Sequence, residues 1–286
     1  MRVLMYENKY FKIPAKSDKN PWMDPKFQPD VMLFLKQHRK LQQIYRSLGV
    51  EVLKIKPRKD LVDSWPANIA WGRNGIFVMG NFHPEVWWRK DETPYYTRWF
   101  ADNRFGVVFL PPDIYFGGQA SLITLNKHYI YGWGTRDSEE AVDYIAEQFR
   151  IHKFIVSVQI IDPDFYDNDT AMHFARGCKG LIWCPEAFGA SDIRRIERML
   201  RQEEIASCKL TKNEAIQDMG NNRRNFVLNS IYIGENEIMP WNEEYSEFPP
   251  KIAKFIDSRG GRRHILDFSE AGVSGAGPRC SSLFLD

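Results

Sequence analysis

Short segments in which apolar and polar residues alternate occur in pairs along the chain, and a turn joins the two members of each pair. Such alternation is typical of half-buried β-strands, and two runs joined by a Gly- or Asn-containing turn predict a hairpin. The pairs lie at residues 66–82, 117–134, 168–185 and 228–240, and a fifth begins at 277 and is completed by residues 3–10 at the N-terminus. The pattern therefore predicts one hairpin motif that recurs along the whole chain.

Segments with helical character separate the hairpins. Helices are predicted at residues 29–48, 93–103, 138–152, 192–203 and 249–259. Asp137 and Ser191 are predicted to cap the third and fourth helices, and Thr211 with Glu214 has the spacing of a capping box. Each unit then ends in one further strand, as at residues 155–162, so the repeat is predicted to be hairpin, helix, strand.

One position in each repeat marks the start of the first hairpin strand. These five anchor residues are Asn68, Gly118, Asp169, Asn229 and Cys280, and their separations are 50, 51, 60 and 51 residues. Such regular spacing is the signature of a repeat architecture. It predicts an α/β fold in a single domain over residues 1–286, a five-bladed αβ-propeller with pseudo-five-fold ββαβ repeats. The alternative is a generic αβ sandwich in which the spacing is accidental.

In such a ring, the first strand of every unit starts at the central axis. The five anchor residues are therefore predicted to converge on one cleft, although they are far apart in the sequence. This prediction follows from the repeat alone and assigns no chemistry to the cleft.

Composition and charge exclude several classes of function. The chain is 43% hydrophobic and 27% charged, with a formal net charge of +2 and no basic block. We therefore expect neither a nucleic-acid partner nor a membrane-surface role. No apolar run approaches the length of a membrane span, and the N-terminus has no signal-peptide pattern, so the protein is predicted to be cytoplasmic.

The four cysteines are a second source of candidate chemistry. They are Cys178, Cys184, Cys208 and Cys280, and none forms a C-x-x-C pair. We predict reduced thiols, no metal site and no cofactor. Cys280 follows Gly275, Gly277 and Pro278 in a loop that favours close backbone approach, which marks it as a candidate site residue. The alternative for Cys280 is a small buried apolar side chain.

Four segments, in order, resemble the dimethylarginine dimethylaminohydrolase and arginine dihydrolase branch of the amidinotransferase superfamily, the guanidine-modifying penteins. They are NFHPEVWWRKDETPYYTRWF from Asn81, YGWGTRDSEEA from Tyr131, DPDFYDNDTA from Asp162 and GAGPRCSSLFLD from Gly275. The resemblance covers nearly the whole length. It implies the five-bladed pentein fold and a cysteine nucleophile that attacks the central carbon of a guanidinium group.

The resemblance also implies roles for individual residues. Cys280 matches the nucleophile, Asp169 matches a carboxylate that holds the planar guanidinium cation, and Arg89 and Arg136 match a clamp for the substrate α-carboxylate. The other three anchor residues, Asn68, Gly118 and Asn229, are predicted to line the substrate-binding part of the same site.

The chain departs from the family pattern where proton transfer is expected. The family histidine lies two residues before the guanidinium-holding carboxylate, and here that position is Asp167, which becomes the candidate acid/base. The family glutamate of the second unit is replaced by Tyr115 or Phe116, its neighbouring Asp is Gln119, and the nearest acid is Asp113. His173 lies too far along its strand to substitute directly, and the sequence does not place His83, His128 or His264.

Three functions are compatible with these residues. The first is a Cys-dependent hydrolase or amidinotransferase that acts on arginine or a related guanidino acid through a covalent thiouronium-type intermediate. The second is a pseudoenzyme, a degenerate pentein that binds a small ligand or a partner protein without turnover. The third is a scaffold pentein without a ligand, which the retained cysteine and arginines disfavour. The sequence leaves open the guanidino compound, the acceptor and the oligomeric state.

Overall fold

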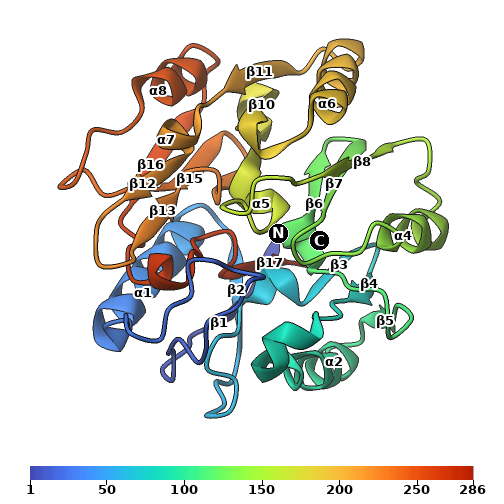
Figure 1. Cartoon of the computed structure of the whole chain (residues 1–286), viewed down its shortest axis with the longest axis vertical. Helices are drawn as coiled ribbons and strands as arrows, with labels where there is room; N and C mark the ends of the chain where they lie inside the picture. Colours follow the sequence, from blue (N-terminus) through green and yellow to red (C-terminus); the bar gives the residue numbers. More distant parts are fainter. Residues whose placement is uncertain (286) are drawn as a thin grey trace.

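The computed structural model describes residues 1–285 and places five three-stranded sheets around a central axis (Figure 1). In each sheet the inner strand pairs antiparallel with the middle strand, and the middle strand pairs parallel with the outer one. In order from inner to outer strand, the sheets are β17 (Ser282–Phe284), β1 (Arg2–Tyr6) and β2 (Glu51–Ile55); β3 (Ala70–Arg73), β4 (Ile76–Met79) and β5 (Gly106–Val108); β6 (Leu122–Leu125), β7 (His128–Trp133) and β8 (Ile155–Gln159); β9 (Met172–Ala175), β10 (Gly180–Trp183) and β11 (Ala206–Lys209); and β14 (Ile231–Ile233), β15 (Asn236–Pro240) and β16 (Arg262–Leu266).

A helix connects the middle strand of every sheet to its outer strand. These helices are α1 (Val31–Ser47), α2 (Glu92–Asp102), α4 (Ala141–Phe149), α6 (Ala190–Gln202) and α8 (Pro250–Asp257), and they lie on the periphery of the ring (Figure 1). A parallel pair needs such a crossover, whereas an antiparallel pair needs only a turn. The ββαβ repeat and the five-bladed αβ-propeller predicted from the sequence are thereby confirmed.

The two ends of the chain complete one blade between them. β17 pairs antiparallel with β1 in the register Val3↔Phe284, Leu4↔Leu283 and Met5↔Ser282. Residues from the N-terminus and the C-terminus thus share one sheet near the axis, where Figure 1 marks both ends. The ring is therefore closed by strand pairing.

The unit with the longest spacing contains an additional hairpin. β12 (Ile216–Asp218) and β13 (Arg224–Phe226) form a two-stranded sheet between β11 and β14. The short helix α7 (Lys212–Ala215) precedes β12, and its capping box between Thr211 and Glu214 is formed as predicted. This insertion accounts for the separation of 60 residues between Asp169 and Asn229.

Two predicted helix caps are wrong. α4 begins at Ala141 and follows Glu140, so Asp137 lies outside the helix. α6 begins at Ala190 and follows Gly189, which places Ser191 inside its first turn. α4 thus starts four positions after Asp137, and α6 starts one position before Ser191. Within residues 1–285, none of the helices is long and apolar enough to cross a membrane.

Short helical turns precede the inner strands and bring the blades together at the axis. They include the 3-10 turn η1 (Pro66–Asn68) and the one-turn helices α3 (Gly118–Ser121) and α5 (Asn168–Ala171). Gly118 has a φ of +62°, and a Cβ atom on it would lie 2.6 Å from the carbonyl oxygen of Ala67. The glycine therefore allows the second blade to approach the backbone of the first.

Replacing Gly118 by alanine is expected to destabilise the fold more than replacing Gly49. Gly49 also has a positive φ of +74°, but a Cβ atom on it would meet no other atom within 4 Å. The Gly49→Ala variant therefore reports the conformational cost alone, about 1–2 kcal/mol, and Gly118→Ala adds a backbone clash. Denaturant unfolding of both variants measures the difference. Equal losses of unfolding free energy would contradict the proposed close approach.

Candidate active site

The starts of the inner strands meet at the axis through direct contacts between blades. The amide of Ala67 donates to the carbonyl oxygen of Cys280 at 3.1 Å, and the amide of Arg279 donates to that of Asn229 at 3.2 Å. Together with the packing of Gly118 on the η1 turn, these contacts bring the anchor residues of the five blades to one place, as the repeat spacing predicts. We call Asn68, Asp167, Asp169, Asn229 and Cys280 the axial site.

Cys280 is held from two sides. The side-chain amide of Asn229 donates to its Sγ at 3.0 Å, and the Oδ1 of Asn229 accepts from its backbone amide at 3.1 Å. The thiol donates to Oδ2 of Asp169 at 3.6 Å. Burial, followed by the charges of Asp169 and Asp167, raises the pKa of the Cys280 thiol well above its ordinary range. Cys280 is therefore a protonated thiol at neutral pH before any ligand binds.

Asp169 is buried beside the thiol and has unused hydrogen-bonding capacity. Its Oδ1 has no hydrogen-bond partner within residues 1–285. Burial and the neighbouring charge of Asp167 raise the pKa of Asp169 well above that of a solvated aspartate. Asp169 also lines a cavity of about 260 Å³ that runs among the inner strands, together with His173, Tyr232 and Arg279. The carboxyl group is thus available to a ligand.

Asp167 faces the axis from the residue before α5. Its Oδ2 accepts from the side-chain amide of Asn68 at 3.0 Å and lies 3.7 Å from Nη1 of Arg136. Its Oδ1 accepts from the backbone amide of Asn168 at 3.1 Å and from Oγ of Ser121 at 3.4 Å. Burial raises the pKa of Asp167, and the positive charge of Arg136 opposes that effect.

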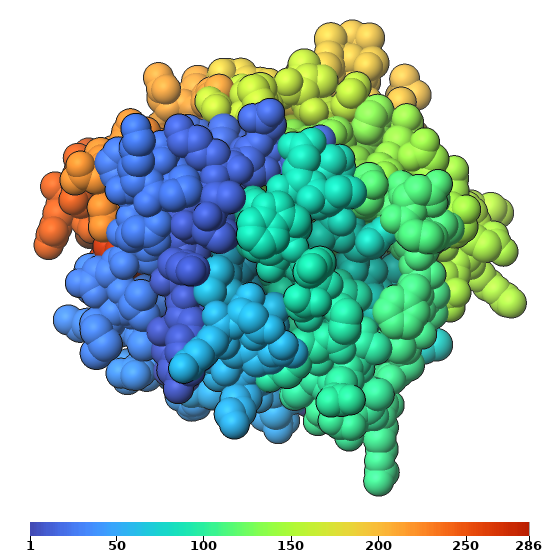
Figure 2. Space-filling view, turned by 60° about the horizontal axis from the view of Figure 1, so that its bottom comes forward, coloured from blue at the N-terminus to red at the C-terminus, as the bar shows by residue number. Residues whose placement is uncertain are grey.

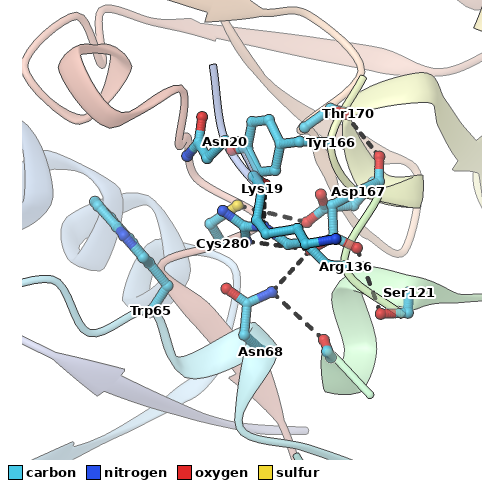
Figure 3. A network of polar contacts seen from close by, with 12 residues as sticks. Lys19, Asn20, Trp65, Asn68, Ser121, Arg136, Tyr166, Asp167, Thr170 and Cys280 are labelled. Atoms are coloured by element: carbon cyan, nitrogen blue, oxygen red, sulfur yellow. Dashed lines mark hydrogen bonds and ion pairs between the residues drawn. The ribbon is translucent and has the colours of Figure 1, made fainter. Parts of the chain in front are cut away.

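Arg136 and the N-terminal segment cover the axial site. The Arg136 guanidinium stacks on the ring of Tyr166 at 4.3 Å from its centroid, and its Nε donates to the carbonyl oxygen of Lys19 at 2.8 Å. Figure 3 shows Asn20 and Lys19 on the same side as Tyr166, above Cys280 and Asp167. Beneath this cover Cys280 is only 3% exposed.

The covering segment is itself packed against the segment that follows β4. Phe11 and Met23 share one apolar cluster with Val86 and Trp88. Figure 2 shows the dark-blue N-terminal segment against the teal segment that follows β4 on this face of the molecule. The cover over the axial site is consequently held by apolar contacts as well as by Arg136.

Arg89 is buried next to the axial site but already has partners. Its Nε and Nη2 donate to the two carboxylate oxygens of Glu92 at 2.7 and 3.0 Å, and its Nη1 donates to Oδ1 of Asn68 at 3.1 Å. The guanidinium also lies 4.1 Å from the centroid of the Phe82 ring. Arg89 therefore orients Asn68, and its role as a carboxylate clamp stays a prediction.

The structure places the Asp137 side chain next to the axial site, whereas the sequence predicted that it caps a helix. Asp137 follows Arg136 directly, and its Oδ1 accepts from the amide of Gly117 at the axis. The side chain is buried at 7% exposure. Asp137 directly follows Arg136 of the Gly-x-Gly-x-Arg turn, and this position could have marked it as a site residue. Its place just before a predicted helix favoured a cap instead.

Other candidates lie away from the axial site or have separate roles. Asp113 is exposed on its loop, so it does not supply the missing family glutamate. His173 is paired with Glu237 at 2.7 Å in the axial cavity. His83 accepts from the amide of Glu85 through Nδ1 and lines a small cavity with Arg136 and Asp137.

Buried acids outnumber buried bases around the axis. The acids are Asp63, Glu92, Asp137, Asp167 and Asp169. The bases that stabilise their charges are the buried Arg89 and the half-buried Arg136 and Arg279. Charges buried without partners are costly, so the site must either retain protons or bind a cation. A thiol beside such carboxyl groups is suited to a planar, positively charged substrate.

Comparisons with known proteins agree with this geometry. No family model matches the chain. The chain is 28% identical over 226 residues to the bifunctional arginine dihydrolase/ornithine cyclodeaminase ArgZ of Synechocystis sp., which covers 77% of this chain but 30% of that relative. It is 31% identical over 155 residues to the dimethylarginine dimethylaminohydrolase of Mycobacterium tuberculosis, over 54% of this chain and 49% of that one.

A solved structure matches the whole fold. The N-terminal domain of ArgZ, an arginine dihydrolase of the ornithine–ammonia cycle in cyanobacteria solved with its product, superposes with a TM-score of 0.83 at 25% identity. The match covers 99% of this chain and 96% of that domain. A variant of that domain has been solved covalently bonded to a reaction intermediate.

A five-bladed αβ-propeller with a thiol and carboxyl groups at its axis defines the class of pentein proteins. The sequence matches to an arginine dihydrolase and a dimethylarginine dimethylaminohydrolase narrow that class. The chain thus has the pentein fold, and its sequence is similar to guanidine-modifying members of that class over part of their length.

Proposed function

We propose that this protein is a Cys-dependent enzyme that acts on the guanidinium group of arginine or of a related guanidino acid. The observation that carries the proposal is the Cys280 thiol, which donates to a buried carboxyl group at 3.6 Å in a site with excess acid. Cys280 is the nucleophile, and Asp169 holds the substrate cation. Asp167 serves as the acid/base in place of the family histidine.

The charge of the site favours a cationic ligand. A guanidinium presents parallel N–H donors that carboxylates accept in a bidentate manner. Oδ1 of Asp169 is free to accept such a bond, since it has no partner within residues 1–285. A bound cation also stabilises the thiolate of Cys280 by lowering the pKa that burial and the two aspartates raise. Substrate binding thus activates the nucleophile.

The covalent step is balanced without an external reactant. Sγ of Cys280 bonds to the central carbon of the guanidinium, a C–N bond breaks, and the thiol proton ends on the nitrogen that leaves as ammonia or an amine. Water then attacks the thiouronium carbon, the C–S bond breaks, and the thiol regains a proton as a ureido product and one further proton are released. Asp167 is placed to carry protons between these groups.

The two arginines and two asparagines have supporting roles in this proposal. Arg136, which lines the small cavity in front of the axial site, is available to bind a substrate carboxylate together with Arg89. Asn229 orients the thiol, and Asn68 orients Asp167. The substrate is therefore an amino-acid-like guanidino compound with a negatively charged end.

We favour water as the acceptor over an amine. The named relatives are hydrolases that act on arginine or dimethylarginine, and the pseudoenzyme alternative is not favoured because these relatives are enzymes. The chain aligns with 30% of the length of the bifunctional relatives, so their second activity, ornithine cyclodeamination, is not carried over.

Direct incubation tests the proposal. Purified protein is incubated with L-arginine, its N-methylated derivatives and agmatine, and the products are identified by mass spectrometry. We expect a ureido product or its breakdown products from at least one compound that carries an α-carboxylate, and slower turnover of agmatine, which lacks it. If none of these compounds is converted or binds in a thermal-shift assay, the proposed function is wrong.

A further inference from the structure

Two buried carboxyl groups flank the same backbone position in the axial site. A Cβ atom placed on Gly117 would lie 3.3 Å from Oδ1 of Asp137 and 3.5 Å from Oδ2 of Asp167. Oγ of Ser121 would lie 2.7 Å from the same point. The two carboxyl groups therefore face a common space that the absence of a side chain at Gly117 leaves open. Asp137 comes from the loop before α4 and Asp167 from the residue before α5.

The groups around this pair contain few positive charges. Arg136 approaches Asp167 to 3.7 Å, and Arg89 contributes from η2 (Pro84–Arg89), although Glu92 binds it. The other titratable groups facing the pair are Asp169 from α5, Tyr131 from β7, Tyr166, Cys280 and Glu140. His83 lines the small cavity next to Asp137, and burial, together with Lys19, lowers the pKa of its imidazole. Two adjacent ionised carboxylates are therefore not compensated.

The two carboxyl groups differ in their hydrogen-bond partners. Burial and the charge of Asp167 raise the pKa of Asp137 well above its ordinary range. Burial raises the pKa of Asp167 as well, but Arg136, the amide of Asn168 and the amide of Asn68 support its ionised form. The amide of Gly117 and the hydroxyl of Ser121 favour the ionised form of Asp137, whereas the ion pair with Arg136 at 3.7 Å favours the negative charge on Asp167.

We propose that Asp137 and Asp167 hold one proton between them and act together as the proton carrier of the axial site. Asp167 is the member that faces Arg136 and Asn68, and Asp137 is a positioning residue that acts through it. The inference rests on the proposed function and deepens it. It explains how a site with an aspartate at the histidine position has both a donor and an acceptor of protons.

The pair ends the covalent half-reaction in the state in which it began. It gives its proton to the nitrogen that leaves the guanidinium carbon, and it takes up the proton that Cys280 loses on forming the C–S bond. In the hydrolytic half-reaction it accepts a proton from the attacking water and passes it on to the departing thiolate. The second proton of that step goes to solvent, so the balance of the reaction is unchanged.

A spectroscopic experiment tests the pair without requiring activity. Infrared spectra distinguish the C=O stretch of a protonated carboxyl group from a carboxylate, and the band lost in Asp137→Asn belongs to Asp137. Its titration midpoint is then measured in the wild-type protein and in Asp167→Asn. We expect the midpoint to fall by about one pH unit or more in Asp167→Asn, because a like charge has been removed.

The control for this experiment is Glu237→Gln, which alters a buried carboxyl group bonded to His173 rather than to the axial pair. The midpoint of the Asp137 band should stay unchanged in that variant. An unchanged midpoint in Asp167→Asn would overturn the proposal, because it would mean that the two groups titrate independently. A wild-type protein without a protonated Asp137 band at neutral pH would overturn it as well.

The pH dependence of turnover gives a second test. The working pair holds one proton, so the rate falls as pH rises through the raised pKa at which that proton is lost. In Asp137→Asn, Asp167 titrates alone beside Arg136, and this alkaline limb should move to lower pH by about one unit or more. His83→Asn should leave the limb in place. If the alkaline limb shifts in His83→Asn and not in Asp137→Asn, the proton carrier is the imidazole of His83 and not the aspartate pair. Absence of turnover with an intact infrared result would reject the proposed function and leave the shared proton standing.

Discussion

Replacing Cys280 by alanine is expected to abolish turnover of the guanidino substrate, with a loss of at least about a thousand-fold in kcat/KM. The reason is that Cys280 supplies the atom that bonds to the guanidinium carbon, and no other thiol is placed to replace it among residues 1–285. The other cysteines, Cys178, Cys184 and Cys208, belong to a different apolar core cluster from that of Cys280. Product formation followed by mass spectrometry measures the loss.

The matched control for Cys280→Ala is Cys208→Ala. Cys208 is also buried, and burial raises the pKa of its thiol to about 11. It lies on β11, the outer strand of its blade, so its replacement should retain turnover even if it reduces stability. Comparable activity in the wild-type protein and Cys280→Ala would remove the nucleophile from the proposed mechanism. Loss of activity in both variants to the same extent would do so too.

Replacing Asp169 by asparagine is expected to separate function from stability. The substitution keeps the shape of the side chain but removes the charge that holds the substrate cation, so kcat/KM should fall about a hundred-fold or more. Burial and Asp167 raise the pKa of Asp169, which means that the ionised form is unfavourable in the folded protein at neutral pH. The variant should therefore melt no lower than the wild-type protein.

Kinetics and thermal unfolding of Asp169→Asn, measured together, show whether Asp169 serves substrate binding or stability. Glu237→Gln is the control, since it neutralises another buried acid and breaks the bond to His173 outside the axial site. We expect it to lose stability and to keep turnover, the reverse of Asp169→Asn. An Asp169→Asn variant that loses several degrees in Tm and keeps full activity would make Asp169 a structural residue.

The excess of buried acid links these expectations to the energetics of the fold. A protein without a ligand gains nothing from burying Asp137, Asp167 and Asp169 around so few arginines, because each buried charge is costly. The cost is understandable if a cationic substrate completes the charge balance during catalysis. Strained or unfavourable groups concentrated in one cleft are typical of functional sites.

Much of the architecture was predictable from the sequence because each repeat encodes itself locally. Alternating strands, turn residues and helix periodicity recur at 50 or 51 residues in three of the four separations between anchor residues, and closure of the ring follows from completing the last hairpin with residues at the N-terminus. The convergence of Cys280 with Asp169 and Asn229 follows from the same symmetry. Local patterns thus predicted which residues meet, although they did not predict how those residues interact.

Helix boundaries and side-chain directions were less predictable, and Asp137 shows why. A polar residue directly before a predicted helical run is a reasonable cap on local grounds. In the structure the helix starts at Ala141, and the Asp137 side chain instead accepts from the amide of Gly117, which precedes the inner strand of the same blade. A partner that is distant in sequence competes with the local cap, and a local pattern contains no information about that partner.

The sequence by itself determined the ring, the order of its blades and the place of Cys280 at the axis. Only the tertiary structure decided the electrostatics there: Arg89 is bound by Glu92, Arg136 covers Asp167, and Asp137 turns inward. The physical reason is that strand and helix patterns are properties of neighbouring residues, whereas burial and charge depend on what all five blades place around one point. The acid content of the site is therefore a property of the closed ring.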